Sequence, residues 1–360
     1  MVAPHREELA ALEEVWNRLS QASELPNVFM TYDWFRVWNR GRSGEPRSGL
    51  RRSHLLVLKR NGAVAGIAPF IYRSSARFGM RLRRLEFVES PADYYDLSVG
   101  NDPAGQVAAL VDYWVQTKNE WDYIHLHALR DVAGTKTALQ RSLKRASLAY
   151  CISPEARCPY LPIQSDWAGT VAHLSARGRK RLKQLRLERL AAKGLRVRII
   201  ENPAAEPGLI DKLIVLERQK RVEGRIMSPF LARYPEVFQS LFQTLGAQGW
   251  FYVILMEWEE RPIAWIMGFR CGRKLWHYQT AYDQAFARLS PGTMLIPRML
   301  DYGLAQGFDE YDFMLGDEPH KWHWASDAHE TFRLQVFSRP WLSWAHRVWW
   351  GVRRLMRSSS

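Results

Sequence analysis

The stretch at residues 290–324, SPGTMLIPRMLDYGLAQGFDEYDFMLGDEPHKWHW, decides how the C-terminal half of the chain folds. Ser290 is a favourable N-cap and the proline after it suits a first helical turn, so a helix is predicted to begin here. It should run to about Gln306, with Gly307 as the residue that closes it. Pro297 removes a backbone hydrogen bond inside this helix, which predicts either a bend there or a later start.

A strand and a loop are expected directly after this helix. Tyr311, Phe313 and Leu315 take every second position, which is the pattern of a strand. An acidic turn at 317–319 then leads into a polar and aromatic loop at 320–324. Helix, strand and loop together predict a place where chemistry occurs.

Three β-rich runs precede the helix. Residues 251–257 and 263–269 are joined by the polar segment 259–262, which predicts a hairpin, and residues 274–282 form a third predicted strand. The predicted order is therefore a three-stranded meander, one helix and one further strand. An anionic ligand is expected at the N-terminus of that helix, because helix N-termini carry unpaired N–H groups and partial positive charge.

Three elements of this region carry a family resemblance. An SPG helix start at 290–292 is followed by a G-F-x-x-x-D-F strand at 307–313 and a G-x-x-x-x-K-x-x-W loop at 316–324. In this order they resemble the CelD/BcsL-type acetyltransferases of the GNAT superfamily, which are relatives of the FemAB-like ligases. The resemblance implies an α/β fold of two tandem GNAT-like domains, with mixed sheets flanked by helices, and acetyl-CoA or another acyl-CoA as co-substrate.

The N-terminal half repeats the same order of elements. Two strand-like runs flank Asn61-Gly62, a strong hairpin signal, and residues 82–88 can add a third strand. Residues 104–118 are expected to be helical and residues 123–128 to form a strand. Three prolines at 154–162 should bridge the two halves.

Three parts of the chain follow from this repetition. We expect an N-terminal GNAT-like domain at 1–160 and a C-terminal GNAT-like domain at 161–340, which carries the acyl-donor site. Residues 341–360 are expected to form a basic amphipathic tail.

The composition is that of a globular protein that attracts anions. The chain has 360 residues, of which 51 are Lys or Arg and 37 are Asp or Glu, giving a formal net charge of +14. This charge favours partners such as CoA, nucleotide-linked sugars, RNA or acidic lipid headgroups. No run of about 18 apolar residues occurs and the N-terminus lacks the apolar core of a signal peptide, so a cytoplasmic protein is expected. Cys151, Cys158 and Cys271 form no CxxC pair, and neither a disulfide framework nor a bound metal is expected.

Two basic segments add to this pattern. Residues 177–193 form a predicted amphipathic helix in which Arg179 is a candidate for receiving negatively charged ligands, although a solvated face of a structural helix explains the same residues. Residues 341–357 place tryptophan and aliphatic residues on one face and arginines on the other. This tail is expected either to dock on an anionic membrane at its inner face or to pack its tryptophan face on the core.

The candidate acyl-donor residues surround the start of the predicted helix. The backbone amides of Gly292 and Thr293 could hold a pyrophosphate, and Gly292 would allow its close approach. Ser290 caps the helix, and Arg288 is the basic residue retained from the Q/R-x-x-G-x-G/A loop of most GNAT enzymes. An ordinary helix cap is the alternative interpretation.

Acyl transfer needs a base for the nucleophile and hydrogen-bond donors for the oxyanion. Asp312, Glu318 and His320 are the candidate bases around the end of the last predicted strand. Lys321 matches the lysine of an aromatic-lysine pair in FemAB-like ligases, and the resemblance implies an ammonium beside the transferred carbonyl. Structural roles are the alternatives: a cap for Asp312, a turn residue for Glu318 and a loop lysine for Lys321.

Candidate acceptor-binding residues lie in both halves. The D-Y-Y-D segment ending at Asp96 resembles the D-Y-x-D segment of the CelD-type family, which implies that Tyr94 and Asp96 line the substrate cleft. Trp322 would form a groove wall or belong to the core. His125 and His127 alternate on a strand, and without a third ligand they are interpreted as structural.

The resemblance implies an acyltransferase acting by direct attack. It would move an acetyl or other acyl group from acyl-CoA to an amine or hydroxyl of an amino sugar or polysaccharide precursor. Two alternatives stay open: a FemAB-like ligase that takes its aminoacyl group from tRNA, and a non-catalytic GNAT-fold protein that binds RNA or another partner. The expected partners are a small-molecule or glycan acceptor, tRNA in the ligase interpretation, and an anionic membrane for the tail.

Overall fold

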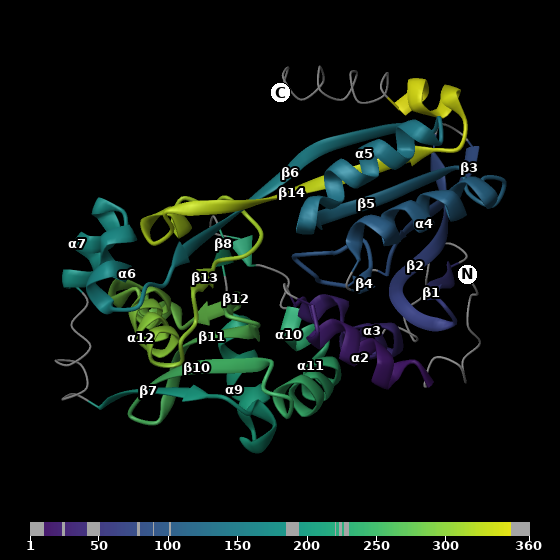
Figure 1. Ribbon diagram of the computed structural model, residues 1–360. Helices are drawn as coiled ribbons and strands as arrows, with labels where there is room; N and C mark the ends of the chain where they lie inside the picture. Colours follow the sequence, from purple (N-terminus) through teal and green to yellow (C-terminus); the bar gives the residue numbers. More distant parts are fainter. Residues whose placement is uncertain are drawn as a thin grey trace. The chain divides into compact units, whose positions relative to one another are not determined.

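The computed structural model of the protein describes residues 11–23, 26–41, 51–77, 80–88, 90–100, 102–184, 194–219, 221–222, 225–226 and 230–346. The chain divides into unit 1, residues 1–156 with 330–360, and unit 2, residues 157–329. Two strands, β6 (Ala149–Pro162) and β14 (Asp327–Phe337), contain the points of division. Each unit combines a mixed sheet with helices, so the predicted α/β fold class is confirmed (Figure 1).

Unit 1 begins with helices and an antiparallel meander. The elements are α2 (Glu13–Gln21), η1 (Val28–Met30), α3 (Tyr32–Gly41), β1 (Arg51–Arg60), β2 (Ala63–Arg77) and β3 (Met80–Phe87). The β1–β2 turn holds Asn61 and Gly62 with φ of 51° and 81°, as the Asn-Gly signal predicts for a hairpin.

The second part of unit 1 adds one crossover between parallel strands. Its elements are β4 (Val99–Gly100), α4 (Pro103–Gln116), β5 (Tyr123–Arg130), η2 (Val132–Gly134) and α5 (Thr135–Arg145). Strand β5 runs parallel to β3 and antiparallel to β14, and α4 packs against α5. Trp114 and Trp121 are fully buried in this unit, where the indole N–H of Trp121 donates to the carbonyl of Trp114.

Unit 2 begins with short helices and three strands. These elements are α6 (Trp167–His173), α7 (Ala176–Gln184), β7 (Leu195–Ile200), η3 (Pro203–Ala205), α9 (Leu209–Glu217), β8 (Arg221–Val222), β9 (Arg225–Ile226), α10 (Phe230–Arg233), α11 (Pro235–Leu241) and η4 (Phe242–Gly246). The segment expected to be a basic helix at 177–193 is helical in α7, and its residues 185–193 lie outside the described part.

The predicted meander, helix and strand follow in unit 2. They are β10 (Phe251–Trp258), β11 (Arg261–Cys271), β12 (Lys274–Tyr282), η5 (Gln284–Leu289), α12 (Pro291–Ala305), β13 (Glu310–Asp312) and η6 (Lys321–His323). Strands β7, β10, β11 and β12 are antiparallel neighbours, whereas β13 is parallel to β12 and antiparallel to β6. Helix α12 lies against β10, β11 and β12 (Figure 1). Its apolar side, including Met294, Leu295 and Met299, is buried in the core of this unit.

Several details differ from the sequence-based expectations. The strand predicted at 311–315 is only the three residues of β13, and Leu315 is 38% exposed because the chain turns at Met314 and Gly316, which have φ of 59° and 111°. Helix α12 continues through Pro297, so the later start is wrong. The prolines at 154–162 do lie where the chain passes from unit 1 to unit 2, and this bridge is part of strand β6.

The division of the chain also differs from the expected boundaries at 160 and 340. The first division point is after Ala156, and the chain returns to unit 1 at Glu330. The reason is that β14 pairs with β5 from Thr331 to Phe337, which places the last strand in the N-terminal unit. Helical residues 340–346 follow that strand in unit 1.

Candidate functional site

A β-bulge in β12 shapes the most distinctive feature of unit 2. Across the β11–β12 pair, Met267 lies opposite Gln279 and Gly268 lies opposite His277. Tyr278 is therefore an extra residue without a partner position on β11. Because a bulge bends a strand and increases its local twist, β12 must change direction at Tyr278.

The parallel strands β12 and β13 stop pairing two residues before Tyr278. Their pairing consists of three positions and ends with Trp276 opposite Asp312. The chain after β13 stays with β6, since the amide of Phe313 donates to the carbonyl of Pro159 at 2.9 Å. Beyond Trp276, no other described strand pairs with β12 on this side. This gap in the pairing of two parallel strands is the opening between β12 and β13.

Gly268 makes the bulge sterically feasible. A Cβ atom at this position would lie 1.9 Å from the carbonyl oxygen of Trp276 and 2.5 Å from the hydroxyl of Tyr252. The same Tyr252 hydroxyl donates to the Trp276 carbonyl at 3.1 Å. Burial raises the pKa of Tyr252 well above its ordinary value, so the phenol stays neutral and remains a donor. Gly268 and the buried hydrogen bond from Tyr252 therefore fix the position of Trp276, the last residue of β12 that pairs with β13.

The start of α12 lies beside the far end of β12. A Cβ atom on Gly292 would be 3.5 Å from the hydroxyl oxygen of Thr280 and 3.9 Å from the ring of Tyr282, which are ordinary contact distances. Gly292 and Thr293 are the second and third residues of the helix, where backbone N–H groups have no intrahelical acceptor. The helix therefore presents anion-binding amides next to the strand that leaves β13.

Ser290 does not act as the side-chain cap that the sequence predicts. Its backbone is left-handed with a φ of 53°, and its side chain makes no capping hydrogen bond. The carbonyl of Ser290 instead accepts the first helical bond, from the amide of Met294 at 3.1 Å. The exposed Arg288 belongs to η5, immediately before this turn. The four predicted donor-site residues thus gather around a helix start that no side chain caps.

The corresponding place in unit 1 is filled by the chain itself. Strand β3 pairs with β5 at two positions, and the Tyr95 segment then takes its place beside β5. The Tyr95 amide donates to the carbonyl of Ala128 and the Arg130 amide donates to the carbonyl of Tyr95, both at 2.9 Å. The start of α4 is capped by the carboxylate of Asp102, which accepts from the amide of Gly105 at 2.9 Å. An incoming anion would meet a carboxylate there.

Comparison with known proteins identifies a domain within unit 2. Residues 175–322 match the model of a family described as an acetyltransferase (GNAT) domain. Unit 2 carries a GNAT acetyltransferase domain. It is of the CelD/BcsL type, as the motifs in its last third predict. No curated protein sequence matches the chain.

Solved structures share the fold of the whole chain. FemX has a TM-score of 0.60 at 12% identity, with 91% of this chain and 96% of FemX covered. The C-terminal domain of a putative lysylphosphatidylglycerol synthetase from Agrobacterium fabrum has a TM-score of 0.58 at 11% identity, with 93% and 94% covered. L-PGS from Bacillus licheniformis has a TM-score of 0.50 at 12% identity, with 98% and 97% covered. At these identities the similarity shows the fold alone. Within the described residues, every helix is too short or too polar to cross a lipid bilayer.

Lys321 of the GNAT domain ties together the turn that follows β13. Its ammonium donates to the carbonyls of Met314, Leu315 and Gly316 at 3.3, 2.7 and 3.3 Å, and it pairs with Glu318 at 2.9 Å. The side chain of Lys321 is only 12% exposed. Four oxygen atoms thus surround an ammonium with three protons, which gives this lysine a structural role whatever else it does.

The three predicted bases occupy different environments. Asp312 is 1% exposed, and one of its oxygens accepts from the amide of Met314 at 2.7 Å. Glu318 is half exposed; partial burial acts to raise its pKa, but the hydrogen bond from Lys321 and nearby positive charge lower it overall. The pKa of His320 is lowered by desolvation and by the charges of Lys321 and His323, against the attraction of Glu318. Of the three, Asp312 lies at the point where the strands part.

Two further residues, which the sequence did not reveal, lie beside Asp312. Glu310 and His329 contact each other at 2.8 Å, and their ligand atoms lie within 4.8 Å of those of Asp312. Glu310 could have been found, because it is two positions from Asp312 on a strand and so shares its face. His329 comes from the start of β14, far away in sequence, and no local pattern indicates it.

This carboxylate and imidazole cluster has the donor atoms that a divalent cation uses. The ammonium of Lys274, however, lies 3.0 Å from both oxygens of Glu310 and 3.3 Å from His329, where it balances the carboxylate charge. Burial acts to raise the pKa of Glu310, but its bonds to His329 and Lys274 lower it overall. The ring of Tyr160 stacks on His329 at 4.2 Å, and burial raises the pKa of this tyrosine to about 12.

Trp322 and Arg179 lie where α7 meets the loop of the GNAT domain. The guanidinium of Arg157 stacks 4.6 Å above the Trp322 ring, which also donates its N–H to Asp317. A cavity of about 580 Å³ borders this ring. Gly178 lets the helix approach, because a Cβ there would be 2.1 Å from the carbonyl of His323. Arg179 donates to the carbonyl of Leu174, which makes it part of the helix start.

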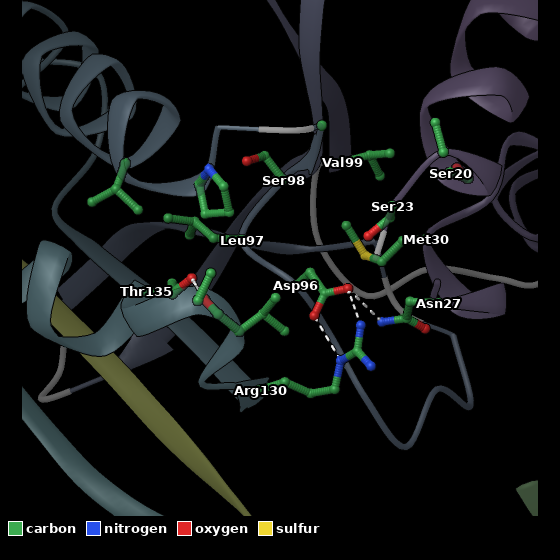
Figure 2. Close-up of a pocket in the computed structure, with 16 residues that line it drawn as sticks. Ser20, Ser23, Asn27, Met30, Asp96, Leu97, Ser98, Val99, Arg130 and Thr135 are labelled. Atoms are coloured by element: carbon green, nitrogen blue, oxygen red, sulfur yellow. Dashed lines mark hydrogen bonds and ion pairs between the residues drawn. The ribbon is translucent and has the colours of Figure 1, made fainter. Parts of the chain in front are cut away.

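Tyr94 and Asp96 belong to unit 1, where a different arrangement holds them. Asp96 accepts two bonds from Arg130, at 2.8 and 2.6 Å, and one from Asn27 at 3.0 Å (Figure 2). These three residues border a cavity of about 600 Å³. Tyr94 is 2% exposed and belongs to the core. Arg130 and Asn27 were not predicted as partners of Asp96, because neither is near the D-Y-Y-D segment.

The histidines of β5 have neighbours that fit the predicted structural role. The ring centroids of His127 and Tyr95 lie 5.2 Å apart, and those of His125 and His127 lie 6.4 Å apart. Burial lowers the pKa of His127. A neutral, packed imidazole is therefore expected at this position at neutral pH.

The first prediction concerns Gly268. Gly268→Ala should lower the free energy of unfolding by about 2–4 kcal/mol, because the added methyl group collides with the backbone at the bulge. Gly292→Ala is the matched control and should change stability by less than about 1 kcal/mol, since its methyl group meets only ordinary contacts. Urea denaturation measures both. Equal stability of the two variants would show that the bulge tolerates a side chain.

The second prediction concerns Lys321. Lys321→Ala should cost about 2 kcal/mol of stability, because it leaves three turn carbonyls without their charged donor. Lys212→Ala is the control: Lys212 pairs with Glu257 at 3.4 Å but is 38% exposed, and its loss should cost under about 1 kcal/mol. If the free energy of unfolding of Lys321→Ala equals that of the wild type, Lys321 does not stabilise the turn.

Proposed function

We propose that the chain is an acyltransferase whose donor site is the opening between β12 and β13. The observation that carries the proposal is the bulge at Tyr278, which separates the two parallel strands beside an uncapped helix start. Acyl-CoA has two chemical parts that suit these features, a pyrophosphate and an arm with amide groups. The family match to a GNAT acetyltransferase domain supports the same donor.

The donor would use both parts of the opening. The backbone amides of Gly292 and Thr293 would receive the pyrophosphate, with Arg288 adding positive charge. The amide-bearing arm would lie along the edge of β12 that β13 has left, where backbone groups can exchange hydrogen bonds with it. This places the thioester near the bulge, where β12 changes direction.

The acceptor would be activated by the cluster around Asp312. An amine or hydroxyl there loses a proton to a carboxylate or to His329 as it attacks the thioester carbonyl, and the CoA thiolate then leaves. Glu310 is ionised at neutral pH because its pKa is lowered, and Lys274 holds it in place. Lys321 takes part by fixing the turn after Asp312, so its role is positioning rather than direct contact.

The acceptor class we favour is an amino sugar or a polysaccharide precursor, in line with the CelD/BcsL-type resemblance. A second candidate is an aminoacyl-tRNA-dependent transfer. It is favoured by α7, whose sequence ARGRKRLKQ holds five basic residues and no acidic one beside the Trp322 loop. The donor distinguishes the two, since one uses CoA and the other uses tRNA.

Calorimetry with acetyl-CoA tests the proposal. The wild type should bind with a micromolar Kd, and Gly292→Ala should weaken binding about tenfold while remaining folded, because its methyl group faces the incoming phosphate. Ala104→Val, at the matching second position of α4 in unit 1, should bind like the wild type.

Three outcomes would contradict the proposal. Equal loss of binding in Ala104→Val and Gly292→Ala would mean that the α12 start is not special. Absence of acetyl-CoA binding together with salt-sensitive tRNA binding would support the aminoacyl transfer instead. Absence of both would favour a non-catalytic binding protein.

A further inference from the structure

The helical residues 340–346, which follow β14 in unit 1, are anchored by one side only. Leu342 is 3% exposed and packs with Leu82, Tyr123 and Phe337. His346 is 6% exposed, and its ring contacts that of Phe337 at 5.3 Å. The side of the helix that faces the protein is thus the one with Leu342 and His346.

The opposite side presents two tryptophans to solvent. Trp341 is 44% exposed and Trp344 is 69% exposed, and they are the only exposed tryptophans among the described residues. They lie three positions apart and so share a helix face. The expectation that this tail packs its tryptophan face on the core is therefore wrong for Trp341 and Trp344.

Two neighbouring exposed indoles need an explanation. Indole is large and apolar, and proteins commonly bury it or place it where one end meets an apolar phase and the other meets water. The lipid headgroup boundary is such a place, and tryptophan is enriched there. An exposed pair on an anchored helix is therefore suited to a bilayer surface.

The charge around the pair indicates the kind of bilayer. Residues 339–360, RPWLSWAHRVWWGVRRLMRSSS, contain five arginines and no acidic residue. Each basic residue near an anionic lipid surface contributes about 1 kcal/mol of attraction. The chain as a whole carries a formal charge of +14. A surface of negative headgroups complements both the indoles and the arginines.

We propose that Trp341 and Trp344 form a docking surface for an anionic lipid bilayer. The indoles would enter the headgroup boundary while Leu342 and His346 keep the helix attached to unit 1. The proposal does not depend on the acyltransferase activity, which lies in unit 2.

Vesicle flotation of the full chain tests the proposal. The wild type should float with phosphatidylcholine vesicles that contain phosphatidylglycerol, and salt should release it. Trp341→Ser with Trp344→Ser should lower the partition coefficient about tenfold or more, and Trp344→Ser alone should lower it less. The control is Val115→Ser with Val215→Ser, two apolar residues on α4 and α9 that are 40% and 54% exposed and should leave binding unchanged.

Each of three results would overturn the proposal. The first is equal recovery of the wild type in the floating fraction with neutral vesicles or without vesicles. The second is binding of the double tryptophan variant at the wild-type level. The third is a wild-type dimer that the tryptophan variant loses, in which case the surface belongs to a second copy of the chain. Thermal unfolding of all variants checks that these exposed substitutions leave the fold intact.

Discussion

The hydrogen bond from Tyr252 to the carbonyl of Trp276 fixes the point at which β12 bends. Gly268 makes room for it, and Tyr278, two residues after Trp276, is the extra residue of the bulge. The opening between β12 and β13, and the position of the α12 start beside it, both depend on this bend. A straight β12 would remain paired with β13 and leave no place for a ligand.

The two units show how one order of elements serves two purposes. Both place a helix between two parallel strands that pair only briefly. In unit 1 the gap is taken by Tyr95 and the helix start by the carboxylate of Asp102. In unit 2 no described strand pairs with β12 in that gap and no side chain caps the helix start, which is why we place the proposed donor site in unit 2. In unit 1, Asp96 and Arg130 form a hydrogen-bonded ion pair beside a cavity. The last described helix of unit 1 carries the two exposed tryptophans.

Local patterns predicted local structure well. The Asn61-Gly62 hairpin, the meander of unit 2 and the helix from Pro291 follow from turn chemistry and periodicity, which act within a few residues. The bulge at Tyr278 was not predicted, because it depends on the absence of a side chain at Gly268, on the neighbouring strand. His329 was missed for a similar reason: β14 brings it beside Glu310 from a distant part of the chain.

The most direct test of this account is amide hydrogen exchange of the full chain with and without acetyl-CoA. We predict that the ligand slows exchange at residues 277–282 of β12 and at 292–295 at the start of α12. Exchange at residues 94–105 of unit 1 should stay unchanged. Protection confined to residues 94–105, or acetyl-CoA binding that leaves residues 277–295 unprotected, would contradict the assignment of the donor site to the opening beside the bulge.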